Sequence, residues 1–187
     1  LDGTLLNSEK RVSKKDINCL NGLVENKIPV IIATGRTIKS VKKVTGELTT
    51  HYPVITLNGS DIRQNINGRS MMIYYLEKDI IEALFNFSLH ALLNSTDYRI
   101  KNILVDTGHK LYFLKPHSPC SVEFYNHYDD EPDLLDLSSP PTQPVVSFLF
   151  LLTDDSNREA FIKAQKKLLP QNTKVCTFNG WPWIEIG

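Results

Sequence analysis

An aspartate that could take part in acid–base chemistry stands second in the chain, within the opening segment LDGTLLN. Asp2 and Gly3 form an Asp-Gly pair, which by itself is a common signal for a turn. A carboxylate in this place could also donate and accept protons in a reaction. The segment alone leaves both interpretations open.

A second group of polar residues, Thr34, Gly35 and Arg36, directly follows the apolar run IPVIIA. Gly35 lets the backbone approach a ligand closely. The residues after it are expected to open a helix, whose free N–H groups and dipole favour an anion. The alternative is that Thr34 only caps that helix.

Asn58 and Gly59 form a third such group, after the apolar segment PVITL. In open α/β sheets, ligands bind at the carboxyl ends of the strands. Three such signals at successive strand ends therefore predict one ligand site at this edge of a sheet.

The elements that must position these residues can be read from hydrophobic spacing. Residues 13–27 and 37–48 have apolar residues at helix spacing, and Ser13 with Asp16 is a helix start signal. Residues 28–34 and 53–57 are nearly continuous apolar runs, typical of strands buried on both faces. The alternation of helix and strand predicts parallel βα units and an α/β sheet.

The second part of the chain has a different pattern. Strands are expected at residues 69–76, 102–106, 110–114 and 145–152, helices at 77–93 and 155–169, and a final hairpin at 173–178 and 183–186. Most of 115–144 is expected to be loop. This order predicts an α+β unit with antiparallel strands, and we place the domain boundary so that residues 1–62 and 63–187 form the two domains.

These motifs resemble those of the haloacid dehalogenase superfamily. DGTLL is similar to the family's first motif without its leading aspartate, VIIATGR to its second, and TLNGS to the Asn-Gly pair of the Cof-type sugar phosphatases, whose C2-type α/β cap follows the third core strand. The resemblance implies a Rossmann-like core, of which residues 1–62 are the N-terminal part, with residues 63–187 as the inserted α+β cap. The C-terminal part of the core would be missing.

The resemblance also implies roles for individual residues. An aspartate before Leu1 would be the nucleophile that forms an aspartyl phosphate, and Asp2, two residues later in an extended segment, would be the general acid and base. Thr34 and Gly35 would bind the phosphoryl group, and Asn58 and Gly59 the substrate. Arg36 would either reach the substrate or brace the loop.

A phosphatase of this kind needs Mg²⁺ to neutralise the phosphate charge. The resemblance implies that the metal binds the nucleophile, the backbone carbonyl of Asp2 and an acid from a later motif. The nucleophile and the family's third and fourth motifs lie outside the chain, which begins with Leu1 rather than methionine. We therefore expect a fragment, truncated at both ends, that is inactive as a phosphoric monoester hydrolase by itself.

The amino-acid composition limits the classes of partner that we expect. Lysine plus arginine equals aspartate plus glutamate at 21 each. This balance gives no reason to expect nucleic acid or a membrane surface as a partner. The three cysteines form no CxxC pair and no apolar run reaches membrane-spanning length, so we expect a cytoplasmic protein. The sequence does not indicate an oligomeric state.

The function that follows is Mg²⁺-dependent hydrolysis of a small phosphorylated metabolite, such as a sugar phosphate. Two alternatives stay open: a phosphomutase of the same subgroup, and a non-catalytic binding protein that keeps the fold. The residue before Leu1 separates the last alternative from the others, since a neutral residue there would favour binding.

Overall fold

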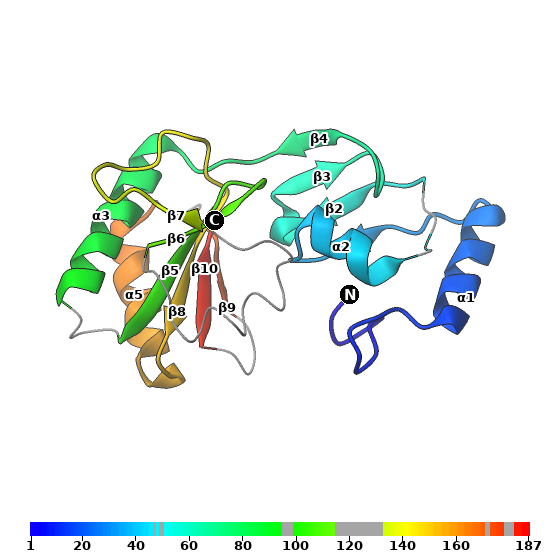
Figure 1. Cartoon of the computed structure of the whole chain (residues 1–187), viewed down its shortest axis with the longest axis horizontal. Coiled ribbons are helices and arrows are strands. Elements are labelled where there is room, and N and C mark those ends of the chain that lie inside the picture. The colour runs from blue at the N-terminus through cyan, green and yellow to red at the C-terminus, as the bar shows by residue number, and fades with distance from the viewer. Residues whose placement is uncertain (47, 49–50, 95–98, 115–132, 171–172, 178–181) are drawn as a thin grey trace. The chain divides into compact units, whose positions relative to one another are not determined.

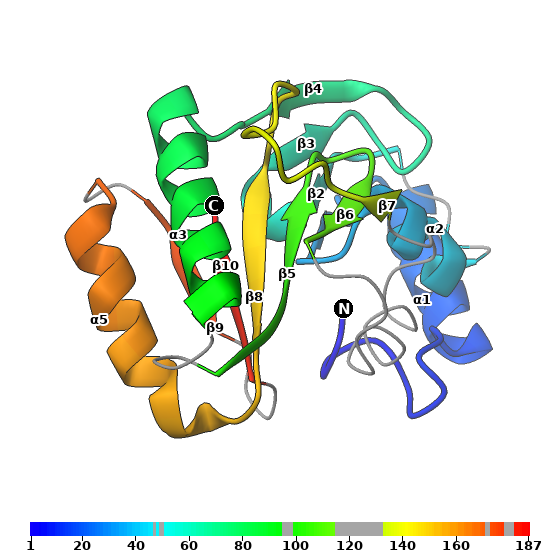
Figure 2. The same ribbon diagram turned by 60° about the vertical axis from the view of Figure 1, so that its left-hand side comes forward.

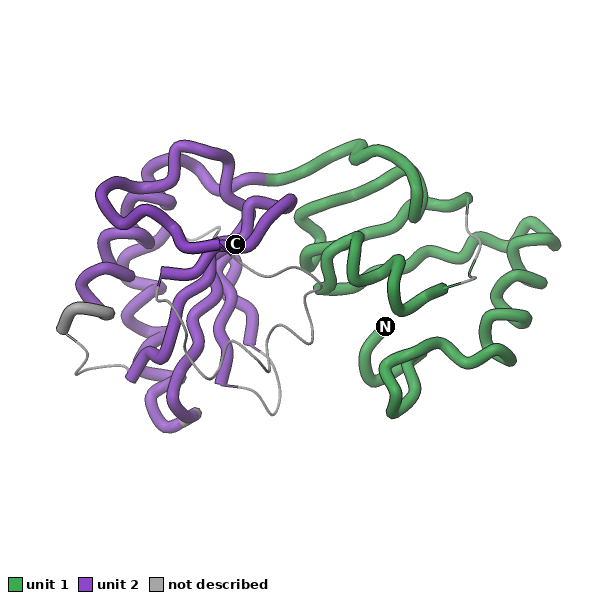
Figure 3. The backbone as a smooth tube through the Cα atoms, viewed as in Figure 1, with its two compact units in different colours: residues 1–74, 127–129 green, residues 75–126, 130–187 purple. Residues whose placement is uncertain are grey.

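The computed structural model describes the whole chain except residues 47, 49–50, 95–98, 115–132, 171–172 and 178–181. Contacts within the chain divide it into two compact units, which separate between Tyr74 and Tyr75 (Figure 3). The predicted boundary was twelve residues earlier, after residue 62. The two positions differ because a hairpin at residues 61–73 continues the sheet of the first unit.

The first unit contains a four-stranded sheet in the order β1-β2-β3-β4 (Figure 1). Strands β1 (Ile32–Ala33) and β2 (Val54–Thr56) are parallel, as the alternation of helix and strand predicted. Strands β3 (Asp61–Arg63) and β4 (Ser70–Ile73) are antiparallel to their neighbours. The sheet is therefore mixed, and a short 3-10 turn, η1 (Leu57–Gly59), joins β2 to β3.

In the described part of this unit, helices α1 (Lys14–Glu25) and α2 (Ile38–Thr45) each begin at a side-chain cap. The Ser13 hydroxyl accepts the Asp16 N–H at the start of α1. The Thr37 hydroxyl accepts the Ser40 N–H at the start of α2. Such caps satisfy backbone donors that have no partner in the first turn. A small core contains Ile32 of β1, Val41 of α2 and Val54 of β2, together with Leu48 and Ile66 from connecting segments.

The prediction for residues 28–34 was wrong in one respect. The apolar run was expected to be a strand buried on both faces, but β1 has only two residues, and Ile28 and Ile31 are 48% and 55% exposed. Within the described residues, β1 pairs only with β2. An apolar run specifies burial only where neighbouring strands and helices are present to cover it.

The second unit contains a six-stranded sheet in the order β7-β6-β5-β8-β10-β9. The strands are β5 (Ile100–Asp106), β6 (Leu111–Phe113), β7 (Asp133–Leu134), β8 (Ser147–Leu152), β9 (Val175–Thr177) and β10 (Trp183–Ile186). Their pairing is antiparallel as predicted, except that β7 is parallel to β6. Strand β7 lies within the segment predicted as loop, of which residues 115–132 are outside the described part.

Helices α3 (Lys78–Asn94) and α5 (Arg158–Leu168) lie side by side over one face of this sheet (Figures 1 and 2). The short turn η2 (Asp155–Asn157) precedes α5. Phe87 of α3 and Phe161 of α5 meet edge to face with ring centroids 5.7 Å apart. Alternate residues of the central strands, such as Phe148 and Phe150, complete the core beneath the helices. No helix among the described residues is long and apolar enough to cross a membrane.

Asp106 at the end of β5 gives this unit a pH-dependent stability. Burial raises the pKa of its carboxyl to about 6, although the Gly108 N–H donates to it at 2.6 Å. A raised pKa stabilises the fold fully below about pH 4, and this contribution is lost as the pH rises through about 6. We expect Asp106→Asn to remove this loss, which is on the order of 1–3 kcal/mol.

Urea unfolding at pH 4.5 and pH 7.5, followed by tryptophan fluorescence, measures the effect, since both tryptophans belong to the second unit. The exposed carboxylate of Asp79 provides the control Asp79→Asn, which should keep the native pH dependence. An unchanged pH dependence in the Asp106→Asn variant would show that Asp106 does not titrate as described.

Candidate active site

The loops after β1 and β2 lie together, as the three polar groups at the strand ends predicted. Thr34 N–H donates to the Ile55 carbonyl at 3.0 Å, which extends the parallel pairing by one residue. The Asn58 N–H then donates to the Thr34 carbonyl at 3.2 Å and the Leu57 N–H to the Arg36 carbonyl at 3.1 Å. These bonds fix the Thr34–Arg36 loop directly against the Leu57–Gly59 turn.

A side chain at position 35 would collide with the side-chain amide of Asn58. A Cβ atom on Gly35 would lie 2.6 Å from Oδ1 of Asn58 and 3.2 Å from its Cγ. The predicted phosphate-binding glycine and the predicted substrate-binding amide are therefore in direct contact. The Thr34 hydroxyl accepts the Arg36 N–H at 3.2 Å, so its own hydrogen can be donated to a ligand.

The turn that carries Asn58 has a strained backbone. Leu57, Asn58 and Gly59 have consecutive φ values of 50°, 54° and 102°, and each of the two non-glycine residues costs about 1 kcal/mol or more in this region. Strain of this kind persists only where the surrounding structure holds it, and it occurs often at functional sites. The strain therefore favours a functional role for the Asn58-Gly59 pair over that of an ordinary connecting turn.

A buried polar cluster joins the two ends of this turn. The Thr56 hydroxyl, just before the turn, lies 3.2 Å from Oδ2 of Asp61, just after it. Arg63 Nη1 donates to the same carboxylate at 3.0 Å, and the Ser70 hydroxyl donates to its other oxygen. Asp61 is only 2% exposed. Sequence reasoning missed this residue, because Asp61 lies in the segment that we interpreted as a domain boundary.

Asp2 lies in a turn and not in the extended segment that was expected. The Leu1 carbonyl accepts the N–H groups of Leu5 and Leu6 at 2.9 and 3.1 Å, and the Thr4 hydroxyl at 3.1 Å. Gly3 has a φ of 71°, which a glycine adopts at little cost. The Asp-Gly signal for a turn is thus confirmed, and it is compatible with a chemical role for the Asp2 side chain.

Asp2 and Arg36 form a bidentate ion pair. Arg36 Nε donates to one carboxylate oxygen of Asp2 at 2.7 Å and Nη2 to the other at 2.8 Å, while Nη1 donates to the Ser40 hydroxyl at 2.8 Å. The Arg36 side chain is 11% exposed and that of Asp2 is 42% exposed. Lys10, which sequence reasoning did not single out, lies 3.5 Å from the same carboxylate.

This pairing determines the charge of Asp2. The hydrogen bonds from Arg36 lower the pKa of the Asp2 carboxyl to about 2, against the opposing effect of partial burial, and the charges of Arg36 and Lys10 add to the lowering. Asp2 is therefore ionised at neutral pH. As it stands it can accept a proton, but it can donate one only after the contact with Arg36 weakens.

Replacing Arg36 by glutamine should raise the pKa of Asp2 from about 2 toward its ordinary value of 3.8. Partial burial then still raises the pKa and Lys10 still lowers it, so the final value reflects the balance of these two remaining effects. With its lowered pKa, Asp2 stabilises the fold above about pH 4, and this contribution is lost as the pH falls toward 2. An NMR titration of the Asp2 carboxyl carbon measures the shift.

Arg36→Lys is the matched control for this titration, because it keeps the charge but cannot form the planar fork. We expect its Asp2 pKa to lie between those of the native protein and Arg36→Gln. If all three titrations coincide, Arg36 does not set the ionisation of Asp2.

The described residues do not make up a metal site by themselves. No three side chains of His, Cys, Asp or Glu among them lie close enough together to hold a metal ion. The Asp2 carboxylate faces two cationic side chains, Arg36 and Lys10. The predicted Mg²⁺ ligand, the backbone carbonyl of Asp2, would need further ligands from outside the described residues.

Comparisons with known proteins show the family of this chain. A family model described as haloacid dehalogenase-like hydrolase matches residues 1–187. A candidate phosphatase of Streptococcus pyogenes serotype M6, M6_Spy0533, is 27% identical over 154 residues, which cover 73% of this chain and 57% of that protein. The chain thus spans little more than half the length of this curated relative.

Two solved structures show the same fold. SMU.1108c from Streptococcus mutans UA159 matches 99% of this chain with a TM-score of 0.78 and 16% identity, and this chain covers 66% of it. The subclass IIB sugar phosphatase BT4131 matches 100% of this chain with a TM-score of 0.74 and 16% identity, again with 66% of that chain covered. These likenesses show an α/β fold with a haloacid dehalogenase-like core and a cap.

Proposed function

Since the chain belongs to the haloacid dehalogenase-like hydrolase family, we propose that the whole protein is a Mg²⁺-dependent phosphatase of a small phosphorylated metabolite. The observation that carries the proposal is the junction of Thr34, Gly35 and Asn58, which meets the Asp2–Arg36 pair at Arg36. The sugar phosphatase BT4131 is one relative of this fold. A sugar phosphate is accordingly the substrate class that we propose.

The proposed reaction has two steps. An aspartate before Leu1 attacks the phosphorus atom, the bond from phosphorus to the leaving oxygen breaks, and a proton passes from Asp2 to that oxygen. Water then attacks the aspartyl phosphate, gives its proton to the Asp2 carboxylate, and releases phosphate with the nucleophile restored. Asp2 thus ends each cycle protonated and ready for the next first step.

The lowered pKa keeps the Asp2 carboxylate ionised and able to accept a proton in the second step, but it also makes the carboxylate a weak base, so the contact with Arg36 must loosen there as well. For the first step, the ion pair with Arg36 must loosen so that the proton is held until the leaving oxygen takes it. The Thr34 hydroxyl and the Gly35 N–H are proposed to donate to the phosphoryl oxygens. Mg²⁺, when bound, would neutralise charge on the phosphoryl group.

Phosphate release by the whole protein tests this function. A panel of sugar phosphates and other phosphorylated metabolites, with Mg²⁺ or with EDTA, should give release from some panel members that depends on the metal. Isomerised sugar phosphate instead of free phosphate would show a phosphomutase. Binding of a panel member without either product would show a non-catalytic binding protein.

The 187-residue chain alone should release no phosphate above the level without protein. It contains Asp2, Thr34 and Gly35, but the family's nucleophile would precede Leu1 and the two later motifs would follow Gly187. The control is the whole protein at the same concentration with the same substrate and Mg²⁺. Metal-dependent release by the 187-residue chain would show that another residue acts as the nucleophile.

A further inference from the structure

The Asp61 side chain lies at the base of the loop that carries Asn58. Thr56 of β2 and Asp61 of β3 are opposite each other, and residues 57–60 connect them. Side chains that are directly opposite in an antiparallel pair lie close together on one face of the sheet. The Thr56 hydroxyl is accordingly 3.2 Å from Oδ2 of Asp61 and 3.3 Å from its carbonyl oxygen, so the hydroxyl hydrogen has an acceptor on Asp61. This contact closes the loop where it leaves the sheet.

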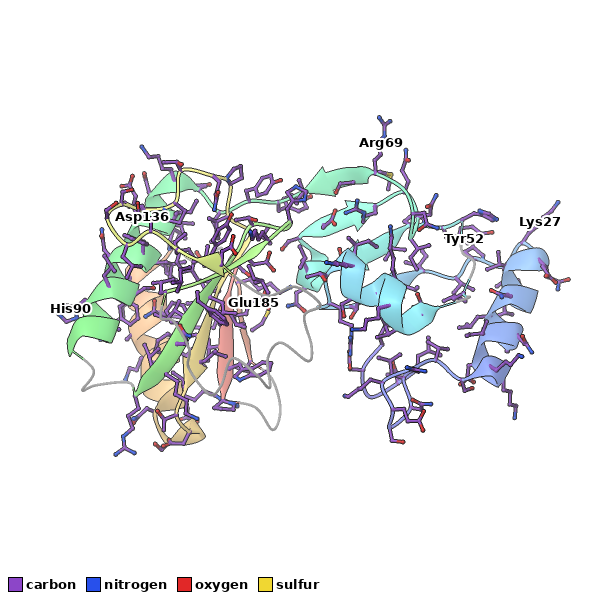
Figure 4. All side chains as sticks on the ribbon, viewed as in Figure 1. Lys27, Tyr52, Arg69, His90, Asp136 and Glu185 are labelled. Carbon is purple, nitrogen blue, oxygen red and sulfur yellow. The ribbon has the colours of Figure 1, made fainter. Side chains whose placement is uncertain are left out.

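The Asp61 carboxylate also connects β3 with β4. Arg63, two residues along β3, donates from Nη1 to Oδ2 at 3.0 Å, and the Ser70 hydroxyl of β4 donates to Oδ1. The side chain of Arg69, the residue before β4, extends away from the ribbon (Figure 4), whereas Asp61 is only 2% exposed. A carboxylate can accept all three bonds because both of its oxygens are acceptors, and asparagine has only one such oxygen. Asp61 therefore joins three strands through a single buried side chain.

The loop needs an anchor of this kind because its backbone is strained. Leu57 and Asn58 have φ values of 50° and 54°, in a region that residues other than glycine rarely adopt. On one side, the N–H groups of these two residues donate to the carbonyls of Arg36 and Thr34 at 3.1 and 3.2 Å. On the other side, the loop is held where it returns to the sheet at Asp61. A strained conformation persists only while such contacts hold it.

We propose that Asp61 is a positioning residue for Asn58. Its bonds to Thr56 and to the neighbouring strands hold the loop so that the Asn58 amide stays against Gly35, the proposed phosphate-binding glycine. Asp61 acts through Asn58 and is not assigned a contact with the substrate. The inference rests on the proposed function in assigning Asn58 to the substrate, whereas the hold on the loop can be measured without catalysis.

Thr56→Val tests the link between Asp61 and the loop. Valine has nearly the shape of threonine and is also β-branched, so it suits a strand, but it has no hydroxyl to donate. Loosening the loop should weaken substrate binding more than it slows the chemical steps. In the whole protein, KM for the sugar phosphate that is hydrolysed fastest should rise about tenfold, with kcat within about twofold of the native value. Asp61→Asn should raise KM by at least the same factor.

Hydrogen exchange gives a second readout, which needs no substrate. The Leu57 and Asn58 amides, which bond to the Thr34–Arg36 loop, should exchange about three- to tenfold faster in Thr56→Val, because local opening of the loop becomes easier. NMR of the whole protein follows both amides in the native protein and in each variant.

Thr45→Val is the matched control. Thr45 of α2 is fully buried and its hydroxyl donates to the Val41 carbonyl at 2.8 Å, so the change removes a buried hydroxyl from another element of the same unit. It should lower the stability but leave KM and the exchange of the two loop amides near their native values. Asn58→Ala provides a second control: if Asp61 acts through Asn58, adding Thr56→Val to Asn58→Ala should not raise KM further.

With substrate turnover measured, the proposal is overturned if Thr56→Val keeps either the native KM or the native exchange of the two amides. It is also overturned if Thr45→Val changes both as much, or if Thr56→Val raises KM equally with and without the Asn58 side chain. If Asp61→Asn does not fold, Thr56→Val decides. If the whole protein hydrolyses none of the phosphorylated metabolites, the proposed function fails and exchange alone decides: faster exchange supports the hold of Asp61 on the loop, and unchanged exchange overturns it.

Discussion

Replacing Asp2 by asparagine is expected to lower kcat for phosphate release by the whole protein by about 10²–10⁴-fold, the usual contribution of a general acid and base. Asparagine has nearly the same shape, and its oxygen can still accept one hydrogen bond from Arg36. It cannot transfer a proton to the leaving oxygen or take one from water. Both chemical steps should therefore slow, whereas KM should change little because Asp2 is not proposed to hold the phosphoryl group.

The control for this variant is Asp79→Asn, which removes one exposed carboxylate from the second unit. It should keep native kcat and KM. Thermal unfolding of both variants shows whether the fold is retained. Because the Asp2 side chain is 42% exposed, solvent screening leaves its ion pair only a small contribution to stability. A folded Asp2→Asn variant with native kcat would remove Asp2 from the reaction.

Replacing Gly35 by alanine is expected to have the second largest effect. The new Cβ would lie 2.6 Å from Oδ1 of Asn58, and 3.2 and 3.3 Å from the Cγ and Nδ2 of the same amide. The Asn58 amide must then shift, or the Thr34–Arg36 loop and the Leu57–Gly59 turn must move apart. We expect a loss of about 1–3 kcal/mol in the free energy of unfolding and a fall in kcat/KM of about 10–100-fold.

Gly22 in α1 provides a matched control. A Cβ atom there would meet no atom within 4 Å, and its backbone is helical, so Gly22→Ala should be neutral or stabilise by about 0.5–1 kcal/mol. The double variant Gly35→Ala with Asn58→Ala removes the clash. Its loss in the free energy of unfolding should be smaller than the sum of the losses of the two single variants. A Gly35→Ala variant as stable and active as the native protein would contradict the close junction.

Local signals in the sequence predicted most of the elements correctly. The helices begin where Ser13 and Thr37 offer hydroxyl caps, and the parallel pairing of β1 with β2 follows from the alternation of apolar runs with amphipathic segments. The family resemblance that the motifs DGTLL and TGR suggested is confirmed by the match over the whole chain. These features depend on residues close together in the sequence.

Features that depend on distant residues were predicted less well. The length of β1 and the exposure of Ile31 depend on which strands lie beside it, and no local pattern records that. Strand β3 was missed because its three residues, Asp61 to Arg63, alternate polar and apolar side chains too briefly to give a period. Asp61 is buried only because Thr56, Arg63 and Ser70 satisfy its carboxylate.

The candidate site also has some features that the sequence predicted and others that it did not. Thr34, Gly35, Asn58 and Gly59 could be expected to meet, because the carboxyl ends of adjacent parallel strands lie at one edge of a sheet. The ion pair between Asp2 and Arg36 joins residues 34 positions apart through a turn at residues 2–5. Its geometry, and with it the low pKa of Asp2, became visible only in the structure.

The most direct test of the central claim is to look for the phosphorylated enzyme. The whole protein is mixed with Mg²⁺ and a substrate labelled in its phosphate, stopped with acid within milliseconds, digested and mapped. We predict an acid-stable, base-labile label on an aspartate immediately before Leu1, and more label in the Asp2→Asn variant if that change slows the second step more than the first. Turnover of the substrate with no labelled aspartate there, or with the label on another residue, would contradict the proposed mechanism.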